Sequence, residues 1–137
     1  IFNKNHFNNY QKIAVIRNLW DRLVSRYFYS KKIDLKFRNF TFKEFVNFDI
    51  KNNMHVLNQY RFCTKDKVSF CIDNVIKFEN LNNDFNEISL SIFGKKNLLK
   101  HSNKTEHGKY RSYYDTELKD KIYKNFKEDI NFFDYEF

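Results

Sequence analysis

The chain has 137 residues, a formal net charge of +8 at pH 7 and two cysteines. It is long enough for one modest domain with its own hydrophobic core, and its apolar runs are too short to span a membrane. We therefore expect a single domain over residues 1–137, with no transmembrane segment in this chain.

The first predicted elements are a strand and the helix that follows it. Residues 12–16 are apolar apart from Lys12 and predict a short buried strand. Residues 18–31 predict a helix, because large apolar side chains recur at helical spacing, and Asn18 is its expected N-cap. Arg17 thus stands between the end of the strand and the start of the helix.

Two further elements are expected in the middle of the chain. Residues 41–48 predict a short helix, in which Thr41 and Glu44 have the spacing of a capping box. Residues 68–78 predict a strand, because β-branched and apolar residues are frequent there.

The last third of the chain predicts two helices and a long loop. Residues 79–93 form the first of these helices, which Gly94 closes. Residues 95–112 are polar and cationic and predict a loop. A last helix begins after Asp115, which serves as its cap, and ends near Phe126.

These elements predict an α/β fold with a mostly parallel sheet flanked by helices. The aromatic segment 130–137 should pack on the body of this fold. Parallel sheets of this kind bind ligands outside the carboxyl ends of their strands, and Arg17 stands at such an end.

The residues around Arg17 have the chemistry of a phosphate site. A guanidinium has a planar fork of donors that suits phosphate oxygens, and Ser25 adds a hydroxyl. Arg22 and Ser25 share a face of the predicted helix, whose N-terminal amides carry partial positive charge. The alternative is structural: Arg17 pairs with Asp21, and Ser25 bonds to its own helix.

The cysteines, Cys63 and Cys71, have no second pair or nearby His residues at zinc spacing, so we expect no metal site. Two reduced thiols are expected in a cytoplasmic protein. A disulfide is the alternative, if the two residues face each other across a hairpin.

The basic charge has two explanations. An AT-rich genome favours Lys codons without any polyanionic partner, while the functional alternative is a surface that attracts phosphate, nucleic acid or an acidic glycan. Aromatic residues make up 20% of the chain and could stack on bases, so a basic nucleic-acid-binding module is one alternative function. No nucleic-acid-binding motif is recognisable, and we expect no nucleic-acid partner.

The segment VIRNLWDRLVSRYF, residues 15–28, resembles the 3′-phosphate-binding motif of sulfotransferases. In that motif an apolar strand leads to Arg, then Asn or Asp, usually Pro, then Arg, two residues, Ser and an aromatic residue. Leu19 replaces the usual Pro, which is a mild departure because Pro is favoured but not required in a first helical turn.

Three later segments are similar to the carbohydrate branch of this family, in the same order along the chain. HVLNQYRFC resembles its His-aromatic-x-Pro-Gln segment, with Val56 and Asn58 departing from the pattern. IDNVIKFENLNNDF resembles its strand followed by Phe-Glu-Asn-Leu and a helix. The stretch from NKTEHGKYRSYYD to the final aromatic tail resembles its C-terminal signature. The likeness extends from about Lys12 to Phe137.

The resemblance implies a P-loop-NTPase-like sulfotransferase fold and the co-substrate 3′-phosphoadenosine 5′-phosphosulfate (PAPS), without a metal. Arg17 and Ser25 would hold its 3′-phosphate, with Arg22 in support. The C-terminal signature implies a loop over the donor nucleotide. The donor-binding residues expected from that loop are Lys104, Thr105 and Tyr110.

The family's amino-terminal phosphosulfate loop has no counterpart in this sequence. Neither Gly94 nor Gly108 precedes Lys-Ser or Lys-Thr, as a phosphate loop requires. The chain therefore resembles the C-terminal portion of a sulfotransferase, and the catalytic residue is unknown. His6 and His55 are candidates, because an imidazole has a pKa suited to taking a hydroxyl proton.

The expected activity is transfer of a sulfuryl group from PAPS to a hydroxyl of a glycan-like acceptor. An inactive, truncated sulfotransferase remnant is a further alternative. The chain opens on Ile1 without a leader pattern, so we expect a cytoplasmic location. The Golgi lumen is the alternative, if an amino-terminal anchor has been removed.

Overall fold

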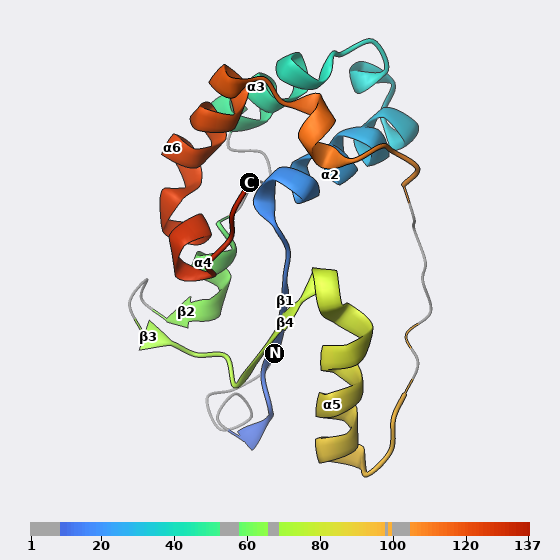
Figure 1. The fold of residues 1–137 in the computed structure, drawn as a ribbon, viewed down its shortest axis with the longest axis vertical. Coiled ribbons are helices and arrows are strands. Elements are labelled where there is room, and N and C mark those ends of the chain that lie inside the picture. Colours follow the sequence, from blue (N-terminus) through green and yellow to red (C-terminus); the bar gives the residue numbers. More distant parts are fainter. Residues whose placement is uncertain (1–8, 53–57, 66–68, 98, 100–104) are drawn as a thin grey trace. The chain divides into compact units, whose positions relative to one another are not determined.

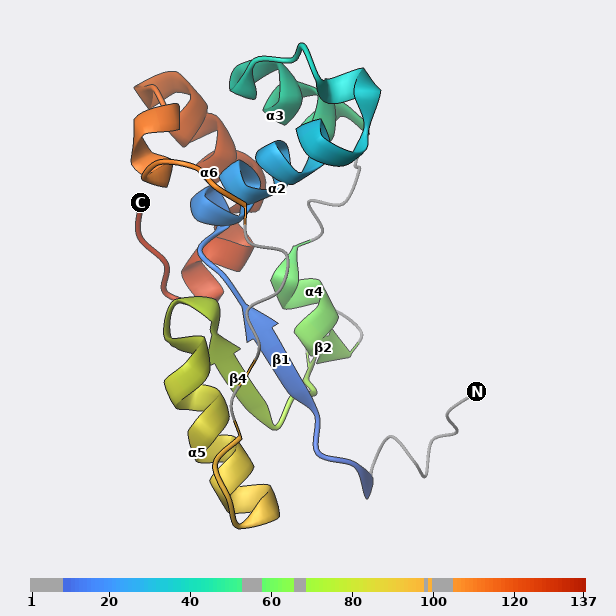
Figure 2. The same ribbon diagram turned by 90° about the vertical axis from the view of Figure 1, so that its right-hand side faces the viewer.

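The structure is a computed structural model that describes residues 9–52, 58–65, 69–97, 99 and 105–137 (Figures 1 and 2). By their contacts, the residues divide into two compact units. The first comprises Ile1–Ile16 and Arg61–Leu99, and the second comprises Arg17–Tyr60 and Lys100–Phe137.

A pair of parallel strands lies at the centre of the first unit. β1, Ile13–Ile16, pairs along its length with β4, Asn74–Lys77. The strand predicted at residues 12–16 is confirmed, but the prediction that it is buried is wrong in part: Ile16 is 1% exposed and Val15 is 53% exposed. Successive side chains of a strand point to opposite faces, so a sheet covered on one face leaves alternate residues exposed.

The single strand predicted at residues 68–78 is two strands in the described part of that range. β3, Ser69–Phe70, pairs antiparallel with β2, Thr64–Lys65, and the chain bends at Asp73 before β4 begins. A carboxylate oxygen of Asp73 accepts the Lys12 amide at 2.7 Å, and the Asp73 amide donates to the Lys12 carbonyl at 2.9 Å. These bonds fix the bend and start the parallel pairing.

The helix predicted after β4 is confirmed. A 3₁₀ turn, η2 (Phe78–Asn80), leads into α5, Leu81–Phe93, which runs beside β4 in Figure 2. Gly94 ends α5 with a φ of 67°, in the left-handed region where a residue without Cβ is favoured.

Three helices pack together in the second unit. They are α2 (Leu19–Ile33), α3 (Phe42–Asn52) and α6 (Thr116–Phe132), and α2 contacts both of the others (Figure 1). The 3₁₀ turn η1 (Leu35–Phe37) joins α2 to α3. The side chains of one hydrophobic core come from every one of these elements. They are Leu19, Trp20, Leu23, Val24, Tyr27, Phe37, Phe42, Phe45, Val46, Leu118, Ile122 and Ile130.

The predicted caps of these helices are present. Asn18 precedes α2, and its side chain accepts the amides of Trp20 and Asp21. Before α3, the Glu44 carboxylate accepts the Thr41 amide at 2.8 Å while the Thr41 hydroxyl accepts the Glu44 amide at 3.3 Å, which is a capping box.

Some elements differ from the sequence predictions. α3 continues to Asn52, beyond the predicted end at residue 48. α6 continues past Phe126, where the backbone leaves helical geometry (φ −129°, ψ 22°) without ending the helix, and stops at Phe132. The short helix α4, Gln59–Cys63, was not predicted, because five residues are too few to show a helical period. It contributes Gln59 and Tyr60 to the second unit.

The described residues therefore have a mixed helix and strand architecture, with one parallel strand pair and one antiparallel pair. This mixture of helices and strands agrees with the predicted α/β class. It is also compatible with the sulfotransferase fold that the resemblance implies. None of the helices in the described part of the chain is long and apolar enough to cross a membrane.

Candidate functional site

Arg17 follows the carboxyl end of β1 and precedes α2. Its Nε donates to Oδ2 of Asp21 at 2.7 Å, and the two side chains are 20% and 21% exposed. This is the ion pair expected from the structural alternative. A guanidinium carries five N–H donors, so an ion pair through Nε is chemically compatible with a phosphate on the same side chain.

The backbone of Arg17 is held by the side chain of Gln59. The Arg17 amide donates to Oε1 of Gln59 at 2.9 Å, and Nε2 of Gln59 donates to the Arg17 carbonyl at 2.9 Å. The same Nε2 donates to Oδ2 of Asp129 at 3.1 Å, while the Tyr60 amide donates to Oδ1 of Asp129 at 2.6 Å. The carboxylate of Asp129, on α6, thereby orients the Gln59 amide group that is hydrogen-bonded to the Arg17 backbone.

Gln59 and Asp129 were not among the candidate residues predicted from the sequence. Gln59 is 8% exposed and Asp129 is 2% exposed. Burial raises the pKa of the Asp129 carboxyl, and its hydrogen bonds from Tyr60 and Gln59 oppose that rise. A signal was present for Asp129, which lies seven residues after Ile122 on the buried face of an amphipathic helix.

The first amides of α2 are already hydrogen-bonded. Oδ1 of Asn18 accepts the Trp20 amide at 3.1 Å and the Asp21 amide at 3.4 Å, and Nδ2 of Asn18 donates to the Glu136 carbonyl at 2.8 Å. The helix can therefore act on an anion near Arg17 through its partial positive charge, rather than through direct bonds from these two amides.

Ser25 and Thr105 are brought together from distant parts of the chain. Their hydroxyl oxygens lie 3.0 Å apart, and either can be the donor. Both residues were candidates for donor binding. The bond to Thr105 is neither the phosphate contact nor the bond to its own helix that the sequence offered for Ser25.

The charges along α2 interact with one another. Burial lowers the pKa of the Arg22 guanidinium, and the positive charges of Arg26 and Arg17 lower it further, whereas the carboxylates of Asp129 and Asp49 raise it. Arg22 therefore lies among charges of both signs, and the carboxylate of Asp129 is the largest charge effect on its pKa.

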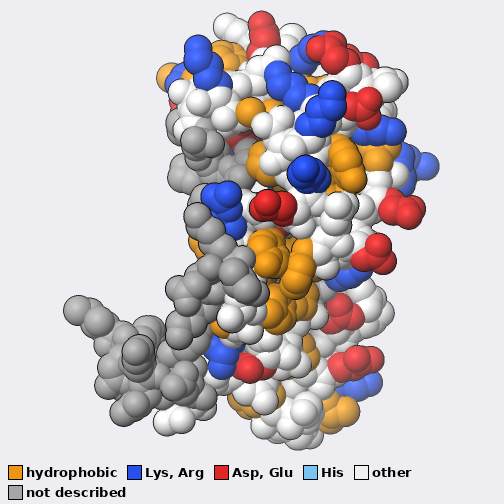
Figure 3. Space-filling model, turned by 90° about the vertical axis from the view of Figure 1, so that its left-hand side faces the viewer, with side chains coloured by type: hydrophobic (Ala, Val, Ile, Leu, Met, Phe, Trp, Pro, Cys, Tyr) orange, Lys and Arg blue, Asp and Glu red, His pale blue; other side chains and the backbone are white. Residues whose placement is uncertain are grey.

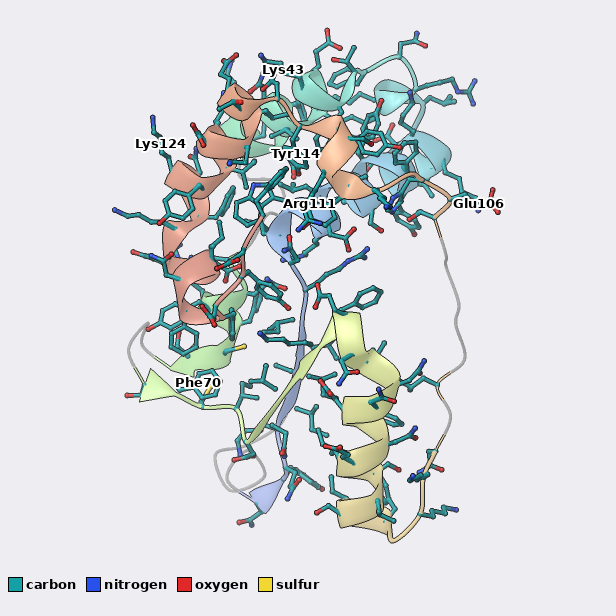
Figure 4. All side chains as sticks on the ribbon, in the orientation of Figure 1. Lys43, Phe70, Glu106, Arg111, Tyr114 and Lys124 are labelled. Atoms are coloured by element: carbon teal, nitrogen blue, oxygen red, sulfur yellow. The ribbon has the colours of Figure 1, made fainter. Side chains whose placement is uncertain are left out.

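Aromatic side chains hold the loop of the C-terminal signature against α2. This segment forms the 3₁₀ turn η3, Tyr110–Tyr113, and the ring of Tyr110 lies 5.8 Å from that of Phe137. Phe137 also packs edge-on to Trp20 at 5.5 Å, which confirms that the aromatic tail packs on the body of its unit. Figure 4 labels Tyr114, whose hydroxyl donates to the Trp20 carbonyl at 2.8 Å.

Three of the candidate residues lie outside the described residues: His6, His55 and Lys104. Among the residues that the structure describes, no group of His, Cys, Asp and Glu could hold a metal ion. Cys63 and Cys71 are free thiols that flank the paired strands β2 and β3, and the Cys71 amide donates to the Cys63 carbonyl at 2.8 Å.

On the face drawn in Figure 3, positive and negative side chains are interspersed rather than gathered into one basic stripe. On the second unit, Lys43 pairs with Glu117 at 2.7 Å and with Asp115 at 3.5 Å.

Comparison with protein-family models gives a match to the model described as the sulfotransferase family, over residues 2–136. The match covers nearly the whole chain and includes Arg17, Ser25 and Thr105. Neither the curated proteins nor the solved structures contain a match to this chain.

Proposed function

Because this chain belongs to the sulfotransferase family, we propose that it holds the 3′-phosphate of PAPS and takes part in transfer of the sulfuryl group to an acceptor hydroxyl. The observation that carries the proposal is the position of Arg17, at the carboxyl end of a parallel strand and directly before a helix N-terminus. Such junctions bind phosphate groups in α/β proteins.

Arg17 supplies the charge in this proposal. Its guanidinium binds the 3′-phosphate, and the ion pair with Asp21 at 2.7 Å orients the side chain until the phosphate binds. Arg22 adds positive charge beside it, since the like charge of Arg17 contributes to the lowered pKa of Arg22.

Ser25 and Thr105 supply neutral donors. Their hydroxyls lie 3.0 Å apart, so both can face one phosphate group, with Tyr110 on the following turn beside the nucleotide. The loop that precedes Tyr110 would then cover the donor, which is a common role for a loop on a rigid scaffold.

The reaction in this proposal is an in-line displacement at sulfur. An oxygen of a glycan hydroxyl attacks the sulfur atom, the bond from sulfur to the bridging phosphate oxygen breaks, and adenosine 3′,5′-bisphosphate leaves. A base accepts the hydroxyl proton, and fixed cationic groups stabilise the charge on the departing phosphate. No step in this reaction requires a metal.

The test is calorimetric titration of the full-length protein with adenosine 3′,5′-bisphosphate and adenosine 5′-monophosphate. A charge-assisted hydrogen bond contributes about 1.5–3 kcal/mol, so Arg17→Ala should weaken binding of the bisphosphate roughly tenfold to a hundredfold. The matched control is Arg38→Ala, which removes an exposed arginine at the end of η1.

Ser25→Ala should weaken the bisphosphate by only about fivefold, because a neutral hydroxyl contributes about 1 kcal/mol. Ser91→Ala, at an exposed position on α5, is its control. Equal affinity of the wild type for the two nucleotides, or an equal loss of both in Arg17→Ala, would refute the assignment. Binding without transfer of labelled sulfate from PAPS to glycan acceptors would identify an inactive remnant.

A further inference from the structure

We propose that Gln59 and Asp129 are positioning residues for Arg17. The carboxylate of Asp129 orients the Gln59 amide, and this amide holds both backbone groups of Arg17 so that the guanidinium projects from a fixed point. The functional consequence rests on the proposed function, in which Arg17 binds the 3′-phosphate of the donor.

The side chain of Gln59 bonds to both backbone groups of Arg17. Its two hydrogen bonds to the Arg17 backbone are both 2.9 Å long and run in opposite directions, one accepted and one donated. Arg17 lies between a strand and a helix, and buried backbone groups at such a junction need hydrogen-bond partners. The side chain of Gln59, 42 positions away in the sequence, bonds to both of them.

Asp129 fixes which way the Gln59 amide faces. The oxygen and NH₂ ends of a glutamine amide are nearly the same size, so the group could be flipped by 180°. A flip would place the NH₂ group opposite the Arg17 N–H, where two donors would face each other. Oδ2 of Asp129 accepts from the NH₂ end of Gln59 at 3.1 Å, and a flipped amide would place an oxygen against it instead. The other carboxylate oxygen of Asp129 accepts the Tyr60 amide at 2.6 Å, which fixes the carboxylate in turn.

Because Gln59 and Asp129 are both buried, the loss of one of their hydrogen bonds should have a measurable effect. Asp129 is 2% exposed and Gln59 is 8% exposed, so water cannot easily replace a lost partner. An asparagine at position 129 has one acceptor oxygen for two donors, the Tyr60 amide and Nε2 of Gln59. Asp129→Asn must therefore break one of these bonds while keeping the shape of the side chain.

The first measurement is amide hydrogen exchange in the full-length protein, which does not depend on any nucleotide. The Arg17 amide should be protected in the wild type and exchange at least tenfold faster in Gln59→Leu and in Asp129→Asn. The Arg22 amide, which donates to the Asn18 carbonyl at 2.9 Å, should keep its protection and so serves as the internal control. Unchanged exchange at Arg17 in Gln59→Leu would overturn the proposal.

The second measurement is the ratio of affinities for adenosine 3′,5′-bisphosphate and adenosine 5′-monophosphate. A displaced binding group loses much of its effect, so Gln59→Leu should reduce this ratio roughly tenfold under conditions where the variant is folded. Gln59→Leu should have no further effect on the ratio when Arg17 is already alanine, because Gln59 acts through Arg17. Gln11→Leu, at an exposed position in the other unit, is the matched control.

A purely structural role would lower stability and leave the ratio unchanged, which would overturn the positioning role. An equal reduction in the presence and absence of the Arg17 side chain would also overturn it. If the wild type shows no preference between the nucleotides, the proposed function fails, and hydrogen exchange at Arg17 still decides whether the Gln59 and Asp129 bonds hold this backbone.

Discussion

The ion pair between Arg26 and Asp49 joins α2 to α3, and its loss should destabilise the second unit. Nη2 of Arg26 donates to Oδ1 of Asp49 at 3.1 Å, and the side chains are 25% and 1% exposed, respectively. Arg26→Met leaves the buried carboxylate of Asp49 without its guanidinium partner. Asp49→Leu leaves the guanidinium of Arg26, which water still reaches. Removing one partner of a buried pair costs about 3–5 kcal/mol. Because Arg26 is partly exposed, we expect a loss of about 2–4 kcal/mol for Arg26→Met and about 1–2 kcal/mol for Asp49→Leu.

Urea unfolding monitored by tryptophan fluorescence measures this loss, because Trp20 is the single tryptophan of the chain and lies in the same core. With a slope of about 2 kcal/mol/M, a loss of 3 kcal/mol lowers the midpoint by roughly 1.5 M. The double variant should recover about 1–3 kcal/mol relative to the sum of the single losses. Arg38→Met, at an exposed site, should change stability by less than about 0.5 kcal/mol. A larger loss for Asp49→Leu than for Arg26→Met would refute the reasoning, as would strictly additive losses.

Three further predictions concern a cap, a titrating group and the thiols. Asn18→Ala should lower the free energy of unfolding by about 1–2 kcal/mol in the same urea assay, because it removes the cap of α2; a loss near zero would contradict this role. The hydrogen bond from the Leu118 amide lowers the pKa of Asp115, so its stabilising effect should be full above the ordinary carboxyl pKa of 3.8 and decline as the pH falls through the lowered value. The difference in unfolding free energy between wild type and Asp115→Ala should therefore shrink below about pH 4, and a difference that grows there would have the wrong sign. Alkylation of the denatured, unreduced protein should label Cys63 and Cys71, as expected for free thiols, whereas absence of labelling would indicate a disulfide.

The sequence predicted those features that depend on residues close together in the chain. The N-cap at Asn18, the capping box of Thr41 and Glu44, and the helix end at Gly94 each rest on contacts within four residues. The junction that presents Arg17 was predicted for the same reason, since a short apolar run and a capped amphipathic segment follow one another.

Only the tertiary structure brought together the groups that surround Arg17. Gln59 meets Asp129 across 70 positions and Ser25 meets Thr105 across 80, so no local pattern relates the members of either pair. The splitting of the range 68–78 into two strands likewise depends on Lys12, which lies 61 positions before Asp73. Local preferences fixed the caps at Asn18 and Thr41 and the end of α5 at Gly94, but not the end of α6. A buried polar group instead takes whichever partner the packed core brings within hydrogen-bonding distance, because leaving it without one costs more than a typical hydrogen bond gains.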